Sequence, residues 1–304
     1  MKFTIIAAAL LATATSSFAA GNGWLTNLEE AQVQAAAQNK PILIEFTGSD
    51  WCPPCKMLNK NVFATETFNS KAPEKFILVE MDFPQNKEGL TPEIQKYRQD
   101  IATKYDIKGY PSIILTDSTG QPLARTGFKS GDADSYLAHL DEILADSVKS
   151  KADLKAAHAL KGEAKAKALI AIIKDKSSTE ISSFHQKEID AIKAADPADS
   201  TGFIKGIEDR TSLEELLVSM TMLAQNEDWD GAQKLIETFS AQENLTPTTK
   251  QEALGYKASI LFKLKKNEET LATLTEAIAI DPSSQKSSSL KAFKAHVEKQ
   301  QASE

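Results

Sequence analysis

Cysteine is scarce in this chain, whose 304 residues include only two, Cys52 and Cys55. This excludes a framework of several structural disulfides, the device of many small secreted folds. A structural zinc site usually needs four ligands. The histidines are too scattered to supply them: His139, His158, His185 and His296. We therefore expect no bound metal and no other cofactor.

Long apolar runs and basic clusters are also missing. After the first 20 residues, no stretch is apolar over the ~20 residues that a membrane-spanning helix needs. The net charge is −7, and acidic residues outnumber basic ones in both halves of the chain. This charge pattern argues against nucleic-acid binding.

The first 20 residues have the pattern of a secretion signal. Lys2 provides a positive end, an apolar run follows, and Ser17 and Ala19 place small residues where a signal peptidase reads them. We predict a signal peptide over residues 1–19, with cleavage after Ala20 as the alternative site. An uncleaved membrane anchor is the other reading, but the apolar run is short for it. The predicted location is periplasmic or secreted.

The two cysteines stand in a Cys-x-x-Cys pattern between a strand signal and a helix signal. An apolar run over 42–46 precedes them, and an amphipathic stretch over 57–63 follows. At a helix start, backbone N–H groups and the helix dipole stabilise a thiolate. The second thiol can then close a ring and release whatever the first has bound. The pattern indicates a dithiol–disulfide exchange site, with a structural disulfide or a metal-carrying thiol pair as alternatives.

Residues 24–148 resemble the thioredoxin superfamily, above all its members from bacterial envelopes. One part of the resemblance is the run from Phe46 to Cys52, and the other is Gly109-Tyr110-Pro111-Ser112 ahead of an apolar run. It implies an α/β domain with a central mixed sheet flanked by helices. It also implies that Pro111 is cis and packs against the disulfide.

The resemblance assigns roles to three candidate catalytic residues. Cys52, at the exposed helix start, would be the attacking thiolate, and Cys55 the buried resolving thiol. Glu45, in an otherwise apolar strand, would move a proton to and from Cys55, and burial would raise its pKa. The alternative is a Glu45 that points to solvent. Many family members have a lysine near this acid, whereas Glu80 occupies the nearest position here.

Three further residues are candidates for substrate binding. Pro111 would place the backbone of Tyr110 beside the sulfurs, where an extended peptide could add main-chain hydrogen bonds. Trp51 and Tyr110 would offer flat apolar surface around the exchange site. Core packing is the alternative role of both aromatic rings.

The spacing of apolar residues and turn signals predicts the order of elements in this domain. We expect helices over 24–38, 52–63, 66–70 and 92–105, strands over 42–47, 75–81, 112–116 and 121–126, and a final helix that Asp132 caps.

Residues 151–304 are predicted to form an all-α domain of helical hairpins. The composition shifts to Ala, Lys and Glu, and strand signals almost vanish. The segments 223–232 and 262–271 are similar, at an offset of 39 residues, and each has the pattern of a turn between two helices. This resembles degenerate tetratricopeptide-type repeats, which usually bind protein. An ordinary antiparallel bundle is the alternative.

The sequence therefore predicts an exported thiol–disulfide oxidoreductase that exchanges disulfides with protein substrates. Such a protein needs a membrane-bound or soluble redox partner, and the helical domain could bind a further protein. The direction of exchange depends on the redox potential, which the sequence leaves open. The alternative function is a redox-inactive or weakly active adaptor whose helical domain binds a protein partner.

Overall fold

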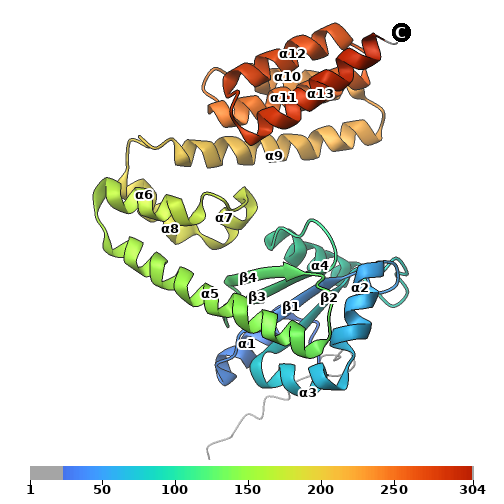
Figure 1. Ribbon diagram of the computed structural model, residues 1–304, viewed down its shortest axis with the longest axis vertical. Coiled ribbons are helices and arrows are strands. Elements are labelled where there is room, and N and C mark those ends of the chain that lie inside the picture. Colours follow the sequence, from blue (N-terminus) through green and yellow to red (C-terminus); the bar gives the residue numbers. More distant parts are fainter. Residues whose placement is uncertain (1–22, 303–304) are drawn as a thin grey trace, which may run out of the picture. The chain divides into compact units, whose positions relative to one another are not determined.

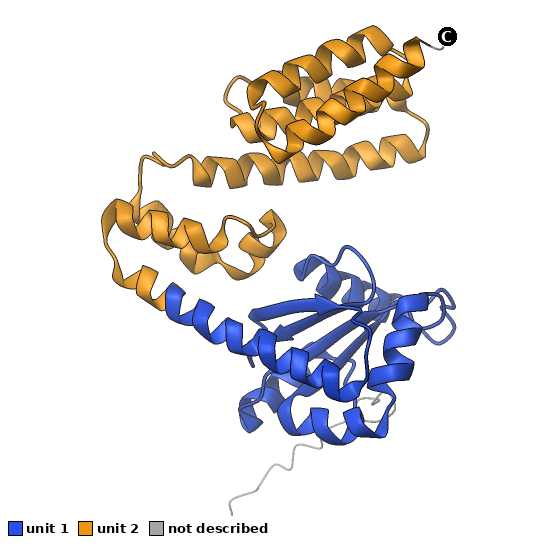
Figure 2. Ribbon diagram, viewed as in Figure 1, with its two compact units in different colours: residues 1–153 blue, residues 154–304 orange. Residues whose placement is uncertain are grey.

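The computed structural model describes residues 23–302, which fall into two compact units (Figure 2). The chain passes from the first unit to the second between Asp153 and Leu154. Each unit has hydrophobic cores of its own. The predicted signal peptide, residues 1–19, lies outside the described residues.

The first unit is built on a four-stranded mixed sheet (Figure 1). Its strands are β1 (Ile42–Thr47), β2 (Ile77–Asp82), β3 (Ser112–Thr116) and β4 (Pro122–Gly127). They lie in the order β2-β1-β3-β4, with β1 parallel to β2 and with β3 antiparallel to both β1 and β4. The predicted central mixed sheet is confirmed.

Helices cover this sheet. They are α1 (Leu28–Gln38), α2 (Pro53–Leu58), the π-helical turn η1 (Asn59–Phe63), α3 (Glu66–Lys75), α4 (Pro92–Lys104) and α5 (Ala133–Ala159). Leu58, Phe68 and Leu140 share one core with Leu43 and Ile113 of the sheet, so α2, α3 and α5 cover the same face.

Strand β1 is the most buried strand and carries the site. All six of its residues are buried, as expected for a central strand covered on both faces. Because side chains alternate along a strand, Glu45 faces the same side as Leu43, toward the core that α2 and α5 cover. Phe46 faces the other side and packs against Tyr105, at the end of α4, with ring centroids 6.1 Å apart.

The first helix begins later than the sequence predicts. Asn27 caps it by accepting a hydrogen bond from the Glu30 backbone N–H at 2.7 Å. Trp24 lies ahead of the cap in the core, where its ring stacks with Phe68, and Leu25 bridges to Val79 of β2. The residues before Asn27 therefore extend the sheet instead of the helix.

Helix α5 continues through the predicted domain boundary near residues 148–151. Residues 133–161 contain neither glycine nor proline, so nothing local ends the helix there. It ends at Ala159, ahead of Gly162, whose φ is 54°. Composition located the change from α/β to all-α structure, but not the end of the helix.

The second unit is helical throughout its described part. Its helices are α6 (Gly162–Ile173), α7 (Ser178–Phe184), α8 (Gln186–Ala195), α9 (Phe203–Gln225), α10 (Trp229–Ser240), α11 (Pro247–Lys263), α12 (Asn267–Ile280) and α13 (Gln285–Gln301). Together with the mixed sheet of the first unit, they confirm the predicted fold class.

The internal repeat of this unit has an offset of 38 residues, and the predicted offset of 39 is wrong. Asp228, between α9 and α10, donates its backbone N–H to the Leu223 carbonyl, and Lys266, between α11 and α12, does the same to Leu261. The hydrogen bonds of the two turns therefore align the repeats with each other, and the alignment based on similar side chains was wrong by one residue. That the hairpins are tetratricopeptide-like remains a prediction.

Candidate functional site

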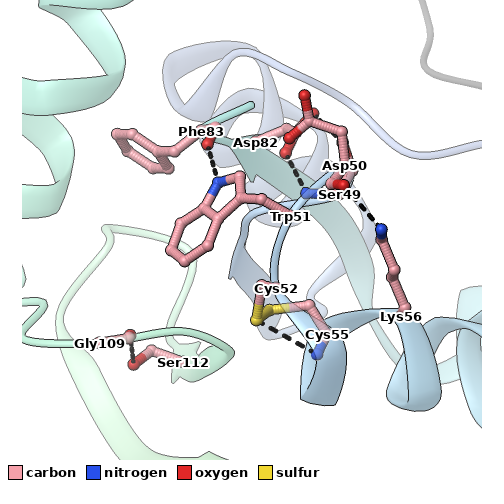
Figure 3. The surroundings of a disulfide bond; sticks show 10 residues. All are labelled: Ser49, Asp50, Trp51, Cys52, Cys55, Lys56, Asp82, Phe83, Gly109 and Ser112. Carbon is pink, nitrogen blue, oxygen red and sulfur yellow. Dashed lines mark hydrogen bonds between the residues drawn. A yellow bond between two sulfur atoms is a disulfide. The ribbon is translucent and has the colours of Figure 1, made fainter. Parts of the chain in front are cut away.

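The two cysteines form a disulfide at the start of α2 (Figure 3). Cys52 is the N-cap residue, and its Sγ accepts a hydrogen bond from the Cys55 backbone N–H at 3.3 Å. Pro53 and Pro54 occupy the first two helical positions, where a missing N–H leaves no intrahelical bond unmade. The N–H of Cys55 is thus a hydrogen-bond donor within reach of the first sulfur.

Both cysteines are buried in the disulfide form. Cys52 is 2% exposed and Cys55 is 1% exposed. The expected exposed position of Cys52 is therefore wrong for this form. The two cysteines still differ in their position in the helix, because Cys52 is the N-cap residue of α2 and Cys55 lies within its first turn.

The loop before β3 contains the second predicted motif. The peptide bond between Tyr110 and Pro111 is cis, as the resemblance implies. Ser112 donates its hydroxyl to the Gly109 carbonyl at 2.8 Å, which closes this turn across the site from Cys52 (Figure 3).

Trp51 and Tyr110 meet in an aromatic cluster with Phe83. The Trp51 indole N–H donates to the Phe83 carbonyl at 2.8 Å. The ring centroids of Trp51 and Tyr110 are 5.8 Å apart, and those of Phe83 and Tyr110 are 5.3 Å apart. Because Trp51 is 39% exposed, the cluster presents apolar surface to solvent.

Glu45 is 4% exposed, so the alternative of a solvent-facing acid is excluded. Burial, assisted by the nearby charges of Glu80 and Asp82, raises the pKa of Glu45 to about 8. The two glutamates are direct partners in the parallel register of β1 and β2. The position opposite Glu45 thus carries an acid rather than a lysine. In the disulfide form, Glu45 therefore keeps its proton at neutral pH.

The turn that carries Cys52 is fastened to the end of β2 and to the loop after it. Ser49 donates its backbone N–H and its hydroxyl to Asp82, at 2.9 and 2.7 Å. Asp50 accepts the backbone N–H groups of Gln85 and Asn86 at 2.9 and 2.8 Å. These hydrogen bonds lower the pKa of Asp50, so its carboxylate stays charged and holds the loop at neutral pH.

Phe83, Asp50 and Asp82 were not predicted as site residues. Parallel strands end at the same edge of a sheet, so residues that follow β1 and β2 become neighbours. That rule, applied to the segments after Thr47 and after Met81, would have brought Asp82 and Phe83 to the cysteine turn.

Two observations concern metals and membranes. Among the side chains of residues 23–302, no group of three or more His, Cys, Asp or Glu residues is placed to hold a metal ion. Within the same range, no helix is both long enough and apolar enough to cross a bilayer.

Known proteins are similar to the first part of the chain. The thioredoxin-like domain family matches residues 28–143. The disulfide bond reductase DsbH of Chlamydia pneumoniae is 32% identical over 131 residues, which are 43% of this chain and 78% of the relative. The thioredoxin-related protein DsbJ of the same organism is 26% identical over 40% of this chain, which spans only 36% of that relative.

One solved structure is also similar to part of this chain. The DsbH oxidoreductase is 29% identical to this chain, with a TM-score of 0.39 over 46% of this chain and 95% of that structure.

Proposed function

Since this chain belongs to the thioredoxin superfamily and is a thiol–disulfide oxidoreductase, we propose that it reduces disulfides in protein substrates. The observation that carries the proposal is the Cys52–Cys55 bridge, which caps a helix beside the Trp51–Tyr110–Phe83 cluster. The name of the DsbH relative, a disulfide bond reductase, supports the direction of the reaction.

In the proposed reaction, the Cys52 thiolate attacks one sulfur of a substrate disulfide. The other substrate sulfur leaves as a thiolate, and a mixed disulfide forms at Cys52. The Cys55 thiolate then attacks the Cys52 sulfur, which releases the second substrate thiol and forms the Cys52–Cys55 bridge. Two electrons pass from the dithiol to the substrate, and Pro111 and the nearby aromatic rings position the substrate chain.

A redox partner, membrane-bound or soluble, must restore the dithiol. A thiolate of this partner attacks Cys52 in the bridge, and Cys55 leaves with the bonding electron pair. A second thiolate of the partner then attacks the partner's sulfur in this mixed disulfide, which releases Cys52 as a thiolate and leaves the partner with a disulfide of its own. Glu45 holds a proton in the bridged form because its pKa is about 8, and we assign to it the donation of that proton to the Cys55 sulfur. This role fits its position on the sheet face that α2 covers.

An insulin-reduction assay tests the proposal. The full-length protein should catalyse insulin reduction in the presence of a chemical dithiol, and Cys52→Ser should abolish catalysis. Cys55→Ser should instead accumulate a mixed disulfide at Cys52, visible as a mass increase. If the intact protein catalyses no reduction with any donor, the adaptor function, in which the helical unit binds a partner, is the better account.

Export, the domain division and a partner of the helical unit are parts of the same proposal. They rest on the apolar N-terminal run, on the composition shift near residue 150 and on the helical hairpins. Expression in a bacterial host followed by mass analysis of the N-terminus tests the first part. A mature protein that begins at Ala20 in the periplasmic fraction supports export, and an intact N-terminus in the cytoplasm contradicts it.

A further inference from the structure

A cavity of about 300 Å³ lies beside the aromatic cluster, between the loop after β2 and helix α4. Its apolar lining comes from Phe83, Pro84 and Leu90. Phe83 is shared with the site, because its carbonyl accepts the Trp51 indole N–H and its ring packs against Tyr110. A polypeptide that crosses the aromatic cluster toward Phe83 therefore meets this cavity next.

The polar lining of the cavity is mainly cationic. Lys87, Lys96 and Arg98 line it, and Asp82 is the one acid among the residues that line it. Both carboxylate oxygens of Asp82 already accept hydrogen bonds from Ser49. This balance contrasts with the net charge of −7 of the whole chain.

The three cations differ in how firmly they are held. Arg98 donates to the Asp82 carbonyl at 2.5 Å, and its charge acts on Glu80, so it belongs to the wall. Lys96 pairs with Asp100 at 2.7 Å, but both side chains are at least 60% exposed, and such a pair is weak. Lys87 is exposed, and no ion pair of it is found within the described part of the chain. Both lysines can therefore bind an anion.

We propose that this cavity, the cationic pocket, binds an acidic side chain of the polypeptide whose disulfide is reduced at Cys52. The proposal rests on the proposed reductase function and adds a substrate preference to it. A carboxylate gains charge-assisted hydrogen bonds from the two lysines, and its methylene groups pack on Phe83 and Leu90. The loop is already fixed by Asp50, so binding does not have to order it.

A matched pair of disulfide-linked peptides tests the preference. The two peptides are identical except that three glutamates beside the cysteine in one are glutamines in the other. We expect the reduced full-length protein to react with the acidic peptide about fivefold faster at low ionic strength, as two exposed ion pairs would give, and the advantage should shrink with added salt.

Two double variants separate the pocket from the overall charge. Lys87→Gln/Lys96→Gln should lower the preference to less than twofold. Lys149→Gln/Lys155→Gln changes two exposed lysines of α5 outside the pocket, loses the same charge and should keep the preference. Equal preferences in both variants, or none in the unmodified protein, would overturn the proposal.

A binding measurement keeps the pocket separate from the chemistry. Cysteine-free versions of both peptides are titrated into the oxidised full-length protein and followed by amide chemical shifts. Saturable shifts over residues 83–99 with the acidic peptide alone support the pocket, even if no peptide disulfide is reduced and the reductase function fails. Equal shifts with the glutamine peptide would assign the cavity to apolar recognition and overturn the proposal.

Discussion

At the scale of single residues, Glu45 is the group whose ionisation the fold alters most clearly within the site. It is buried in β1 with a second glutamate opposite it. Burial and like charge both favour the protonated form. The same surroundings therefore favour the proposed donation of a proton to Cys55 and make Glu45 costly to ionise.

Glu45→Gln should slow the opening of the disulfide by a thiol donor. The variant cannot donate the proton, so we expect a rate about tenfold below that of the unmodified protein at pH 6–7, a modest effect for general acid catalysis. The ratio of the two rates should fall toward one as the pH rises through about 8, the pKa of Glu45. Ionisation of the thiol donor affects both proteins equally, so it cancels in this ratio. A ratio that does not depend on pH would contradict the assignment.

Glu45→Gln should also change how stability depends on pH. The unfolded chain releases the Glu45 proton above its ordinary pKa of 4.5, whereas the folded chain keeps it until about pH 8. The contribution of this proton to the free energy of unfolding is therefore fully present below pH 4.5, and it is lost as the pH rises from 4.5 to about 8. At pH 9 the oxidised variant should be more stable by roughly a few kcal/mol, and at pH 4 the gain should vanish. Denaturant unfolding at both pH values measures this.

At the scale of elements, the turn between β1 and α2 has a packing constraint that its sequence does not announce. A Cβ atom on Gly48 would lie 2.5 Å from the Trp51 ring. The ring cannot move aside freely, because its N–H is bonded to the Phe83 carbonyl. The φ of Gly48 is not positive, so the backbone conformation does not require glycine at this position. The space beside the Trp51 ring does.

Gly48→Ala should therefore displace Trp51 and slow the reaction of Cys52 with protein disulfides by roughly tenfold, while the fold persists. Fluorescence of the variant should report a changed Trp51 environment, and far-ultraviolet dichroism should not change. Gly206→Ala, in α9, where φ is not positive and an added Cβ meets nothing within 4 Å, is the comparison for the general effect of removing a glycine. Normal rates in Gly48→Ala would show that the ring position is unimportant.

At the scale of the whole molecule, the described chain has separate hydrophobic cores in its two units. Ile236 is fully buried in the helical unit. Ile236→Ala should destabilise that unit by about 3 kcal/mol and lower its melting temperature. The rate at which the Cys52–Cys55 bridge reacts with dithiothreitol should not change. A matched loss of that rate would show that the first unit depends on the second for its stability.

The sequence was sufficient for those parts of the molecule where local signals decide the structure. Strand β1 was predicted at its observed ends because β-forming residues follow Pro41 and a glycine-containing turn follows Thr47. The cysteines and the Pro111 loop were found because each motif is continuous in the chain.

Long-range contacts decided the rest. Phe83 joins the site because β2 lies parallel to β1, a pairing between segments that are far apart in the chain. Helices α7 and α8 are separated at His185, whose ring nitrogen lies 3.3 Å from a carboxylate oxygen of Glu188. Glu188 also contacts His158 of α5, so this break depends on tertiary packing.

The acid pair across β1 and β2 also has a consequence for laboratory evolution. A library of this chain screened only for survival of heating should be enriched in apolar residues at position 45, since they remove the desolvation penalty of a buried acid. Those survivors would have lost the proposed proton donor, so a screen for heat tolerance should be coupled to a screen for turnover.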